Sequence, residues 1–236
     1  MRVGLVWPIT VRCSRMKRWR ISILTVGILM FISSPLSAAG PETNFWKWFQ
    51  KHEQALYDFE KDQARVFDSL NAALTRVGAD LTFEFGPKRS DGRREFVVSS
   101  GGIKSAFPRV EALCDAAPKL DHWIIIKFRP RRPTLHDLTY NEKQVKASEV
   151  RCLLFKDAKP NKVGIMMFLP GYRKGLEKDD FGQIGYLFLD EALGEYDVET
   201  KVGAIVFDEM ASKHFAQSRP LSELGSAFDD HFKNKP

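Results

Sequence analysis

Apolar residues between Asn44 and Val77 recur at steps of three and four, the spacing of an amphipathic helix. The stripe predicts one long helix, or two helices with a break near Lys61. His52 and Gln63 place polar side chains within the apolar row, which favours packing against a sheet over a coiled coil. The members of the stripe are Phe45, Phe49, Leu56, Phe59, Val66, Leu70, Ala73 and Val77.

Alternating apolar positions farther along the chain indicate strands. Residues 81–85 and 95–99 predict a hairpin, because the segment 86–92 between them is rich in turn residues. A short helix is expected over residues 108–117. Residues 123–128 predict a third strand, which is expected at the centre of a sheet because its middle is continuously apolar.

The second half of the chain repeats this mixture of short strands and helices. Its expected elements are a hairpin tip at 140–143, a strand pair at 150–155 and 163–169, a helix at 180–193 ended by Gly194, a strand at 195–207 and a final helix at 221–232. The order favours an α+β domain with a mostly antiparallel or mixed sheet of about six strands and helices packed on one face. No internal repeat or linker is visible, so residues 40–236 are expected to form a single domain.

Charge separates the first 39 residues from the rest of the chain. The 236 residues carry a formal net charge of +6, yet six of the 36 basic residues and none of the 30 acidic ones precede Gly40. The remainder is therefore neutral. A neutral body gives no basis for binding nucleic acid, so none is expected as a partner.

The N-terminal 39 residues have the organisation of a signal peptide. A cationic stretch, residues 16–20, precedes the apolar residues 21–34, which are short for a membrane span of roughly 20 residues. Small residues at 37–39 predict cleavage after Ala39. Residues 1–15 form an upstream extension, and either Met1 or Met16 is the start.

Cleavage places the domain in the periplasm or outside the cell. The alternative is an uncleaved anchor, in which case the N-terminal segment is the only contact with the membrane. Cys114 and Cys152 remain in the exported part, where an oxidising compartment allows a disulfide between them. Each lies among apolar residues, where a cysteine also serves as a small core side chain.

Three motifs that resemble ligand sites fail on inspection. Gly101 and Gly102 follow a strand and precede a helix, as a phosphate loop does, but Ile103 separates the glycines from Lys104. An anion at this helix start remains an alternative to an ordinary glycine turn. The acidic triplet at 195–199 lacks the glycine and final glutamate of a calcium loop, so a surface row of ion pairs is favoured. Neither cysteine nor histidine spacing indicates zinc, and no metal or cofactor is expected.

Two regions are candidates for binding. Arg129, Arg131 and Arg132 form the densest basic cluster, held extended by two prolines, and such a cluster can bind carboxylates or phosphates. A solvated exit from the preceding strand is the favoured explanation of this cluster. The second region joins Tyr172 and Arg173 with Tyr186, around a charged loop and a helix start that contains glycines. Each glycine lowers helix stability by about 1 kcal/mol relative to alanine, and one explanation for these glycines is close approach of another backbone or of a ligand.

Four segments resemble domain families of exported bacterial proteins whose function is unknown. These segments are FWKWFQKHE at 45–53, LTFEFGP at 81–87, FLPGY at 168–172 and, above all, LDEALGEYDVETKVG at 189–203. The resemblance covers most of the exported part. It implies a compact α+β domain and assigns no activity, cofactor or site residue.

Catalytic motifs are missing from this sequence: it has no GxSxG element and no recognisable cysteine-protease segment. The favoured hypothesis is therefore an exported, non-enzymatic domain that binds a protein partner or envelope component through the region of Tyr172 and Tyr186. The alternative is a hydrolase whose dispersed site uses carboxylates and His122, because catalytic groups need not be close in sequence.

Overall fold

The structure, a computed structural model, describes residues 40–175 and 178–233. Gly40–Pro236 form one compact unit, while the predicted signal peptide and both candidate start residues lie outside the described part. Within the described ranges, no helix has the length and apolar character needed to cross a membrane. The unit contains two buried hydrophobic clusters, one in residues 40–128 (the N-terminal lobe) and one in residues 134–233 (the C-terminal lobe).

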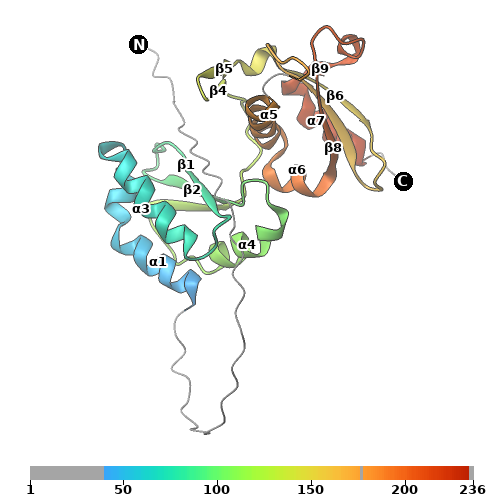
Figure 1. Cartoon of the computed structure of the whole chain (residues 1–236). Helices are drawn as coiled ribbons and strands as arrows, with labels where there is room; N and C mark the ends of the chain where they lie inside the picture. Colours follow the sequence, from blue (N-terminus) through green and yellow to red (C-terminus); the bar gives the residue numbers. More distant parts are fainter. Residues whose placement is uncertain (1–39, 176–177, 234–236) are drawn as a thin grey trace, which may run out of the picture. The chain divides into compact units, whose positions relative to one another are not determined.

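The N-terminal lobe places its helices against a three-stranded sheet of order β1-β2-β3 (Figure 1). β1 pairs with β2 antiparallel, as the predicted hairpin requires, and β3 pairs with β2 parallel. The elements are α1 (Pro41–Lys51), α2 (Glu53–Tyr57), α3 (Gln63–Thr75), β1 (Thr82–Phe85), β2 (Arg94–Ser99), α4 (Phe107–Asp115) and β3 (Trp123–Lys127), with single-turn helices at Phe59–Lys61 and Lys104–Ala106.

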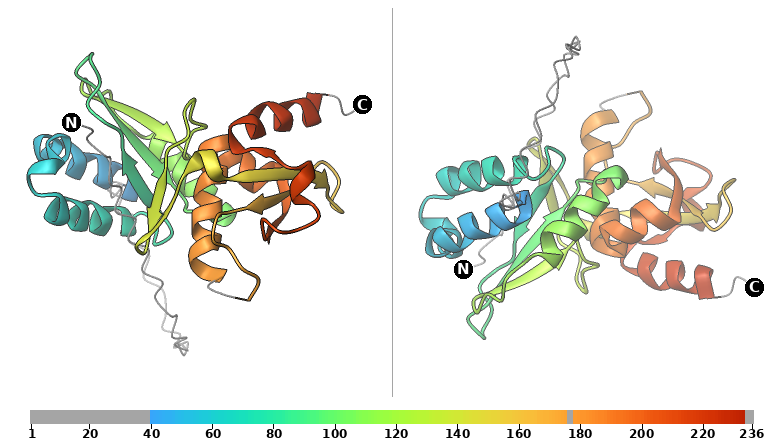
Figure 2. Two further views of the ribbon diagram at one scale, coloured as in Figure 1. Left: turned by 90° about the horizontal axis from the view of Figure 1, so that it is seen from above. Right: turned by 90° about the horizontal axis from the view of Figure 1, so that it is seen from below.

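The apolar stripe of residues 44–77 packs on this sheet as predicted, but it is divided more often. The helix breaks at His52 and again around Phe59–Lys61, so α1 and α3 lie side by side on the sheet. Figure 2 shows both helices on the same face. Phe49 and Phe96 are fully buried with their ring centroids 5.0 Å apart, and a row of aromatic contacts extends from them through Trp123.

The C-terminal lobe is built around a four-stranded sheet of order β8-β7-β6-β9. Its elements are β4 (Leu138–Tyr140), β5 (Lys143–Val145), β6 (Arg151–Lys156), β7 (Val163–Phe168), α5 (Lys178–Leu193), α6 (Glu195–Lys201), β8 (Val202–Asp208), β9 (Arg219–Pro220) and α7 (Leu224–Lys233), with single-turn helices at Ala147–Glu149, Phe215–Gln217 and Leu221–Glu223. β4 and β5 form the small hairpin expected around residues 140–143.

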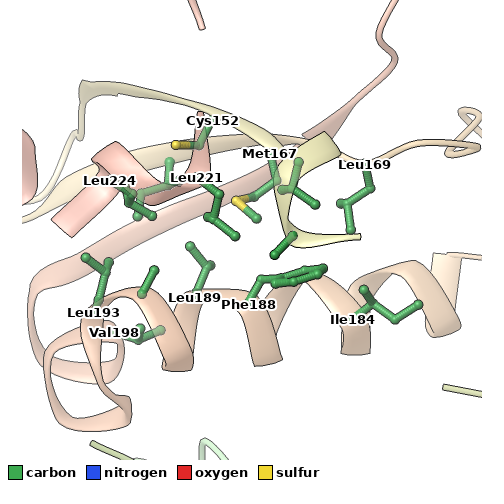
Figure 3. Close-up of a cluster of buried hydrophobic side chains, with 14 of the residues drawn as sticks. Cys152, Met167, Leu169, Ile184, Phe188, Leu189, Leu193, Val198, Leu221 and Leu224 are labelled. Carbon is green, nitrogen blue, oxygen red and sulfur yellow. The ribbon is translucent and has the colours of Figure 1, made fainter. Parts of the chain in front are cut away.

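One face of α5 supplies much of the second core. Figure 3 shows Ile184, Phe188 and Leu189 pointing from α5 toward Met167 and Leu169 of the sheet side. All five side chains are fully buried. Each burial of this kind contributes about 1.5–3 kcal/mol, so the amphipathic pattern of residues 180–193 accounts for how α5 is held on the sheet.

The two lobes share a topology that the sequence does not reveal. In each, an antiparallel hairpin is followed by a helical connection to a strand that lies parallel to the hairpin's second strand. This arrangement, called the first unit in the N-terminal lobe and the second unit in the C-terminal lobe, consists of β1-β2-α4-β3 and of β6-β7-α5-α6-β8, respectively. A strand–helix–parallel strand connection buries a helix on the sheet, which different residues can achieve equally well. The shared arrangement therefore leaves no repeated sequence.

The α+β class with antiparallel and mixed sheets is confirmed, and two finer expectations are wrong. The described residues form nine strands in three sheets rather than one sheet of about six. β3 lies at the edge of its sheet instead of the centre. Its isoleucines are half-buried, which fits an edge position, and Arg132 of the connecting segment bonds to Glu95 on the neighbouring strand β2.

Residues 195–201 form the helix α6, whereas the sequence predicts a strand there. Gly194, with φ of 85°, ends α5 and starts α6, and acidic residues in the first turn of α6 favour a helix over a strand. Glu195, Asp197 and Glu199 thus do not share one face of a strand. Only Val202–Asp208 form the strand expected at the end of this segment.

Candidate functional site

β8 forms one edge of the four-stranded sheet and pairs with β7 alone among the described residues. It has seven residues, VGAIVFD, and none of the first six is charged. Other edges in the described part are shorter or carry charge: β1 contains Glu84, β3 ends at Lys127 and β9 has two residues. Proteins usually protect long edges with charge or proline, so an uncharged edge is unusual.

The predicted binding residues Tyr172 and Tyr186 meet at this edge through Phe207 of β8. The ring of Phe207 lies 6.0 Å from Tyr172 and 6.5 Å from Tyr186, between centroids. Their exposure differs greatly: Tyr172 is 6% exposed and also packs on Phe181, whereas Tyr186 is 43% exposed. Tyr172 therefore supports the edge from inside, and Tyr186 presents an aromatic ring to solvent.

The opposite face of the sheet is also apolar beside β8. Leu153, Met166 and Val206 are neighbours in register across β6, β7 and β8, and none belongs to the buried cluster under α5. Val206 is 38% exposed, and Met210 just after the strand is 37% exposed. The β8 edge, defined here as Tyr186 with residues 205–207, thus has apolar side chains on both faces.

Glycine at position 185 explains how Tyr186 and Phe207 come together. A Cβ atom at Gly185 would lie 2.2 Å from the ring of Phe207, so only glycine lets this ring pack against α5. Gly182, one turn earlier, has no heavy atom within 4 Å of its would-be Cβ. Gly185 is therefore approached closely, but by a side chain and not by the backbone or ligand suggested from the sequence, and Gly182 is not approached at all.

Arg173 and Lys174 lie at the C-terminal end of β8. Lys174 forms an ion pair with Asp208 at 2.8 Å, and its backbone N–H donates to the carboxylate of Glu209. Hydrogen bonding to Lys174, followed by that to Ser212, lowers the pKa of Asp208 to about 2. Arg173 is exposed and has no ion pair among residues 40–175 and 178–233.

The predicted arginine cluster binds carboxylates, but those of its own chain. Arg129 contacts Glu84 and Asp190, and Arg132 contacts Glu95 at 3.0 Å. Arg131 pairs with Asp229 at 2.8 Å and lies 3.9 Å from Asp197. These arginines join the two lobes and the segment between them. The solvated strand exit favoured by the sequence is wrong for Arg129, whose side chain is largely buried, and binding of an external anion gains no support, because the partners of these arginines are internal.

The Gly101–Gly102 turn likewise binds an internal anion, Glu195. One carboxylate oxygen of Glu195 accepts from the backbone N–H groups of Ser100 and Gly102 and from the Ser100 hydroxyl, at 2.8–3.2 Å. Its other oxygen accepts from the backbone N–H of Arg129 at 3.0 Å. Positive φ at Gly101 and Gly102 shapes this turn. The sequence favoured an ordinary glycine turn, with an anion at this position as the alternative, and it did not identify Glu195 as the occupant.

Asp190 is the most perturbed acid of this junction. Burial raises the pKa of its carboxyl to about 7; Arg129 opposes the rise, and the nearby carboxylates of Glu195 and Glu84 add to it. Its Oδ2 accepts from Nη1 of Arg129 at 3.2 Å. The guanidinium group of Arg129 thus contacts two carboxylates, with that of Glu195 bound to the Arg129 backbone N–H nearby, and the surplus of negative charge favours a proton on Asp190.

The hydrolase hypothesis gains no support from the described residues. His122 lies in a shallow polar groove beside Tyr57, Glu53 and Asp91, yet no hydrogen bond joins its ring to a nucleophile or carboxylate in this part of the chain. In residues 40–175 and 178–233, no group of three His, Cys, Asp or Glu side chains is arranged to hold a metal ion.

Cys114 and Cys152 are both free and buried, each in a different hydrophobic cluster, so the disulfide left open by the sequence does not form. Burial raises the pKa of each thiol to about 12. A thiol with so high a pKa supplies little of the nucleophilic thiolate.

Stability is expected to fall as pH rises from about 4 to about 7, because the folded protein retains a proton on Asp190 that the unfolded chain has released. The loss attributable to Asp190 is at most about 4 kcal/mol. Burial also raises the pKa of Glu199 and adds in the same direction. Urea unfolding at about pH 5 and about pH 8 should show a smaller decline for Asp190→Asn than for the wild type. An equal decline in Asp190→Asn and in the exposed control Asp121→Asn would contradict this assignment.

Two glycines of α5 should respond oppositely to alanine. Gly182→Ala is expected to raise the free energy of unfolding by about 0.5–1 kcal/mol, because alanine favours the helix and meets no neighbour. Gly185→Ala should lower it, because the new methyl group displaces the Phe207 ring. Urea unfolding of both variants measures the difference. Equal stabilisation by the two substitutions would show that Phe207 does not depend on Gly185.

No match to this chain was found among protein-family models, curated proteins or solved structures. The resemblance to families of exported bacterial domains therefore stays a prediction.

Proposed function

We propose that the protein is an exported, non-enzymatic domain that binds a partner protein or envelope component through the β8 edge. One observation carries the proposal. Tyr186, which is 43% exposed, packs against Phe207 at the edge of a sheet, and the edge strand is uncharged through its first six residues. A half-exposed tyrosine beside apolar surface is typical of the residues that dominate protein interfaces.

The support for Tyr186 comes from how firmly its surroundings are fixed. Phe207 is held against α5 by the glycine at 185 and is flanked on its other side by the buried Tyr172. A binding residue on a fixed support loses less conformational entropy on association than one on a mobile loop. This geometry is consistent with Tyr186 contacting the partner and with Tyr172 holding Phe207 in place beneath it.

Export is the second part of the proposal. It is supported by the cationic and apolar stretches before Ala39 and by the start of the compact unit at Gly40, the residue that follows the predicted cleavage site. α1 begins at Pro41, so cleavage at this position leaves the folded unit intact. We propose a periplasmic or secreted location, with an uncleaved N-terminal anchor as the alternative.

Replacing Tyr186 by alanine should abolish capture of the partner while leaving the fold intact. Immobilised residues 40–236 of the wild type, Tyr186→Ala and Tyr196→Ala would be compared for proteins retained from an envelope extract of the host. Tyr196 is the matched control because it is 49% exposed and lies on α6, away from the β8 edge.

A protein retained by the wild type and Tyr196→Ala should be lost from Tyr186→Ala. With that protein purified, the dissociation constant should rise about 30-fold for Tyr186→Ala, the effect of removing an interface tyrosine worth about 2 kcal/mol. Equal retention by all three proteins would rule out Tyr186 as a contact, and so would the absence of any specifically retained protein.

A further inference from the structure

The β8 edge has unpaired main-chain groups that call for a particular kind of partner. In a parallel pair, each strand directs the N–H and C=O groups of alternate residues toward its neighbour and those of the residues between them away from it. Since β8 pairs only with β7 in the described part, the second set faces the free side. A further extended strand is the structure that satisfies such groups.

Protection of this edge is confined to its beginning. The β7–β8 register shifts between Val163 and Ile165, which marks a bulge at the start of β8. The carboxylate of Asp157 accepts from the backbone N–H of Ala204 at 2.7 Å. From Ile205 to Phe207 the strand is regular, uncharged and without proline. These three residues are therefore the open part of the edge.

Side chains on both faces of the edge define what an added strand would carry. Tyr186 and Phe207 lie on the face covered by α5, and Val206 lies on the opposite face in line with Met166. Successive side chains of a strand point to opposite faces. An added strand would thus meet apolar surface on both faces, so it is expected to be apolar over a short stretch, with an aromatic or branched residue beside Tyr186.

The positive charge of Arg173, near the end of β8, places a further requirement on the sequence of an added strand. Arg173 lies between Tyr172, which packs on Phe207, and Lys174, which binds Asp208 and Glu209. It is exposed and carries no ion pair among the described residues. A carboxylate on the added strand would complement it.

A second copy of this chain, pairing through its own β8, does not supply a carboxylate for Arg173. The acidic residues at the end of its own β8 are already engaged: Asp208 is 5% exposed and bound by Lys174, and Glu209 accepts from the Lys174 N–H. Pairing β8 with β8 would therefore leave Arg173 without a carboxylate partner from that strand. A different chain is the better match.

We infer that the β8 edge binds an extended segment of the partner protein as an additional strand, apolar over its contact with residues 205–207 and bearing an acidic residue next to Arg173. The inference rests on the proposed function and states its mode and the chemistry of its ligand. Main-chain hydrogen bonds hold the segment, while Tyr186, Val206 and Arg173 select its sequence.

The test is selection of peptides from a random library displayed on phage, with residues 40–236 as the target. Recovered peptides should share a short apolar stretch with Asp or Glu at one end. Amide hydrogen exchange with one such synthetic peptide bound should show new protection within residues 205–207. Binders without this pattern, binders that leave β8 exchange unchanged, or no binders at all would overturn the inference.

Variants separate the contributions of strand and charge. Val206→Lys, which places a charge on an exposed edge position, should weaken peptide binding at least about tenfold. Thr139→Lys, an exposed position on β4, is the matched control and should bind as the wild type does. Arg173→Ala should weaken binding of the acidic peptide about twofold to fivefold and leave binding of its Gln-substituted form unchanged. Equal effects of the two lysine variants, or of Arg173→Ala on the two peptides, would overturn it.

Three further outcomes lead to different conclusions. A dimer that Val206→Lys converts to monomers, measured by sedimentation, would show that a second copy occupies the edge and would overturn the inference. Loss of the cellular partner from Tyr186→Ala without any effect of Val206→Lys would overturn strand addition alone. Failure of both variants to change partner binding would remove the proposed function as well.

Discussion

The two lobes depend on one buried carboxylate, that of Glu195. It accepts three hydrogen bonds from the turn at Ser100–Gly102 and one from the backbone of Arg129, so a single side chain joins the end of β2, the segment after β3 and the start of α6. Glu195 is fully buried. Removing one partner of a buried charged group leaves the other unsatisfied, which is strongly destabilising, so these elements are constrained together.

That constraint also determines where the candidate site lies. Gly194 takes a positive φ, and a Cβ atom there would approach the backbone of Arg131 to 3.2 Å, so the α5–α6 corner packs closely on the connecting segment. α6 then leads directly into β8. The corner therefore sets the position of β8 relative to α5, and with it the contact between Phe207 and Tyr186.

Local patterns in the sequence predicted most elements, because hairpins, helix stripes and turn glycines depend on neighbours in the chain. They also brought Tyr172 and Tyr186 into one region. They failed where tertiary contacts determine the secondary structure or the partner of a side chain. Residues 195–201 form a helix where a strand was expected, and Glu195 at its start binds the turn of the other lobe. The arginines 129, 131 and 132 have partners 37 to 98 positions away. No local pattern contains such pairings, and the uncharged edge of β8 is visible only when strand order is known.

The shared topology of the two lobes gives a final argument about that edge. In the first unit, the face opposite the helices carries Glu84 and Glu95, which the connecting segment covers through Arg129 and Arg132. In the second unit the same face carries Arg151 and Asp208 at one end, bound within the lobe by Ser218 and Lys174. The row beside them, Leu153, Met166 and Val206, has no charge to bind a connecting segment. The first sheet thus has its covering partner within the chain, held by ion pairs. The second has an apolar face beside an open strand, the combination that another chain's extended segment would cover.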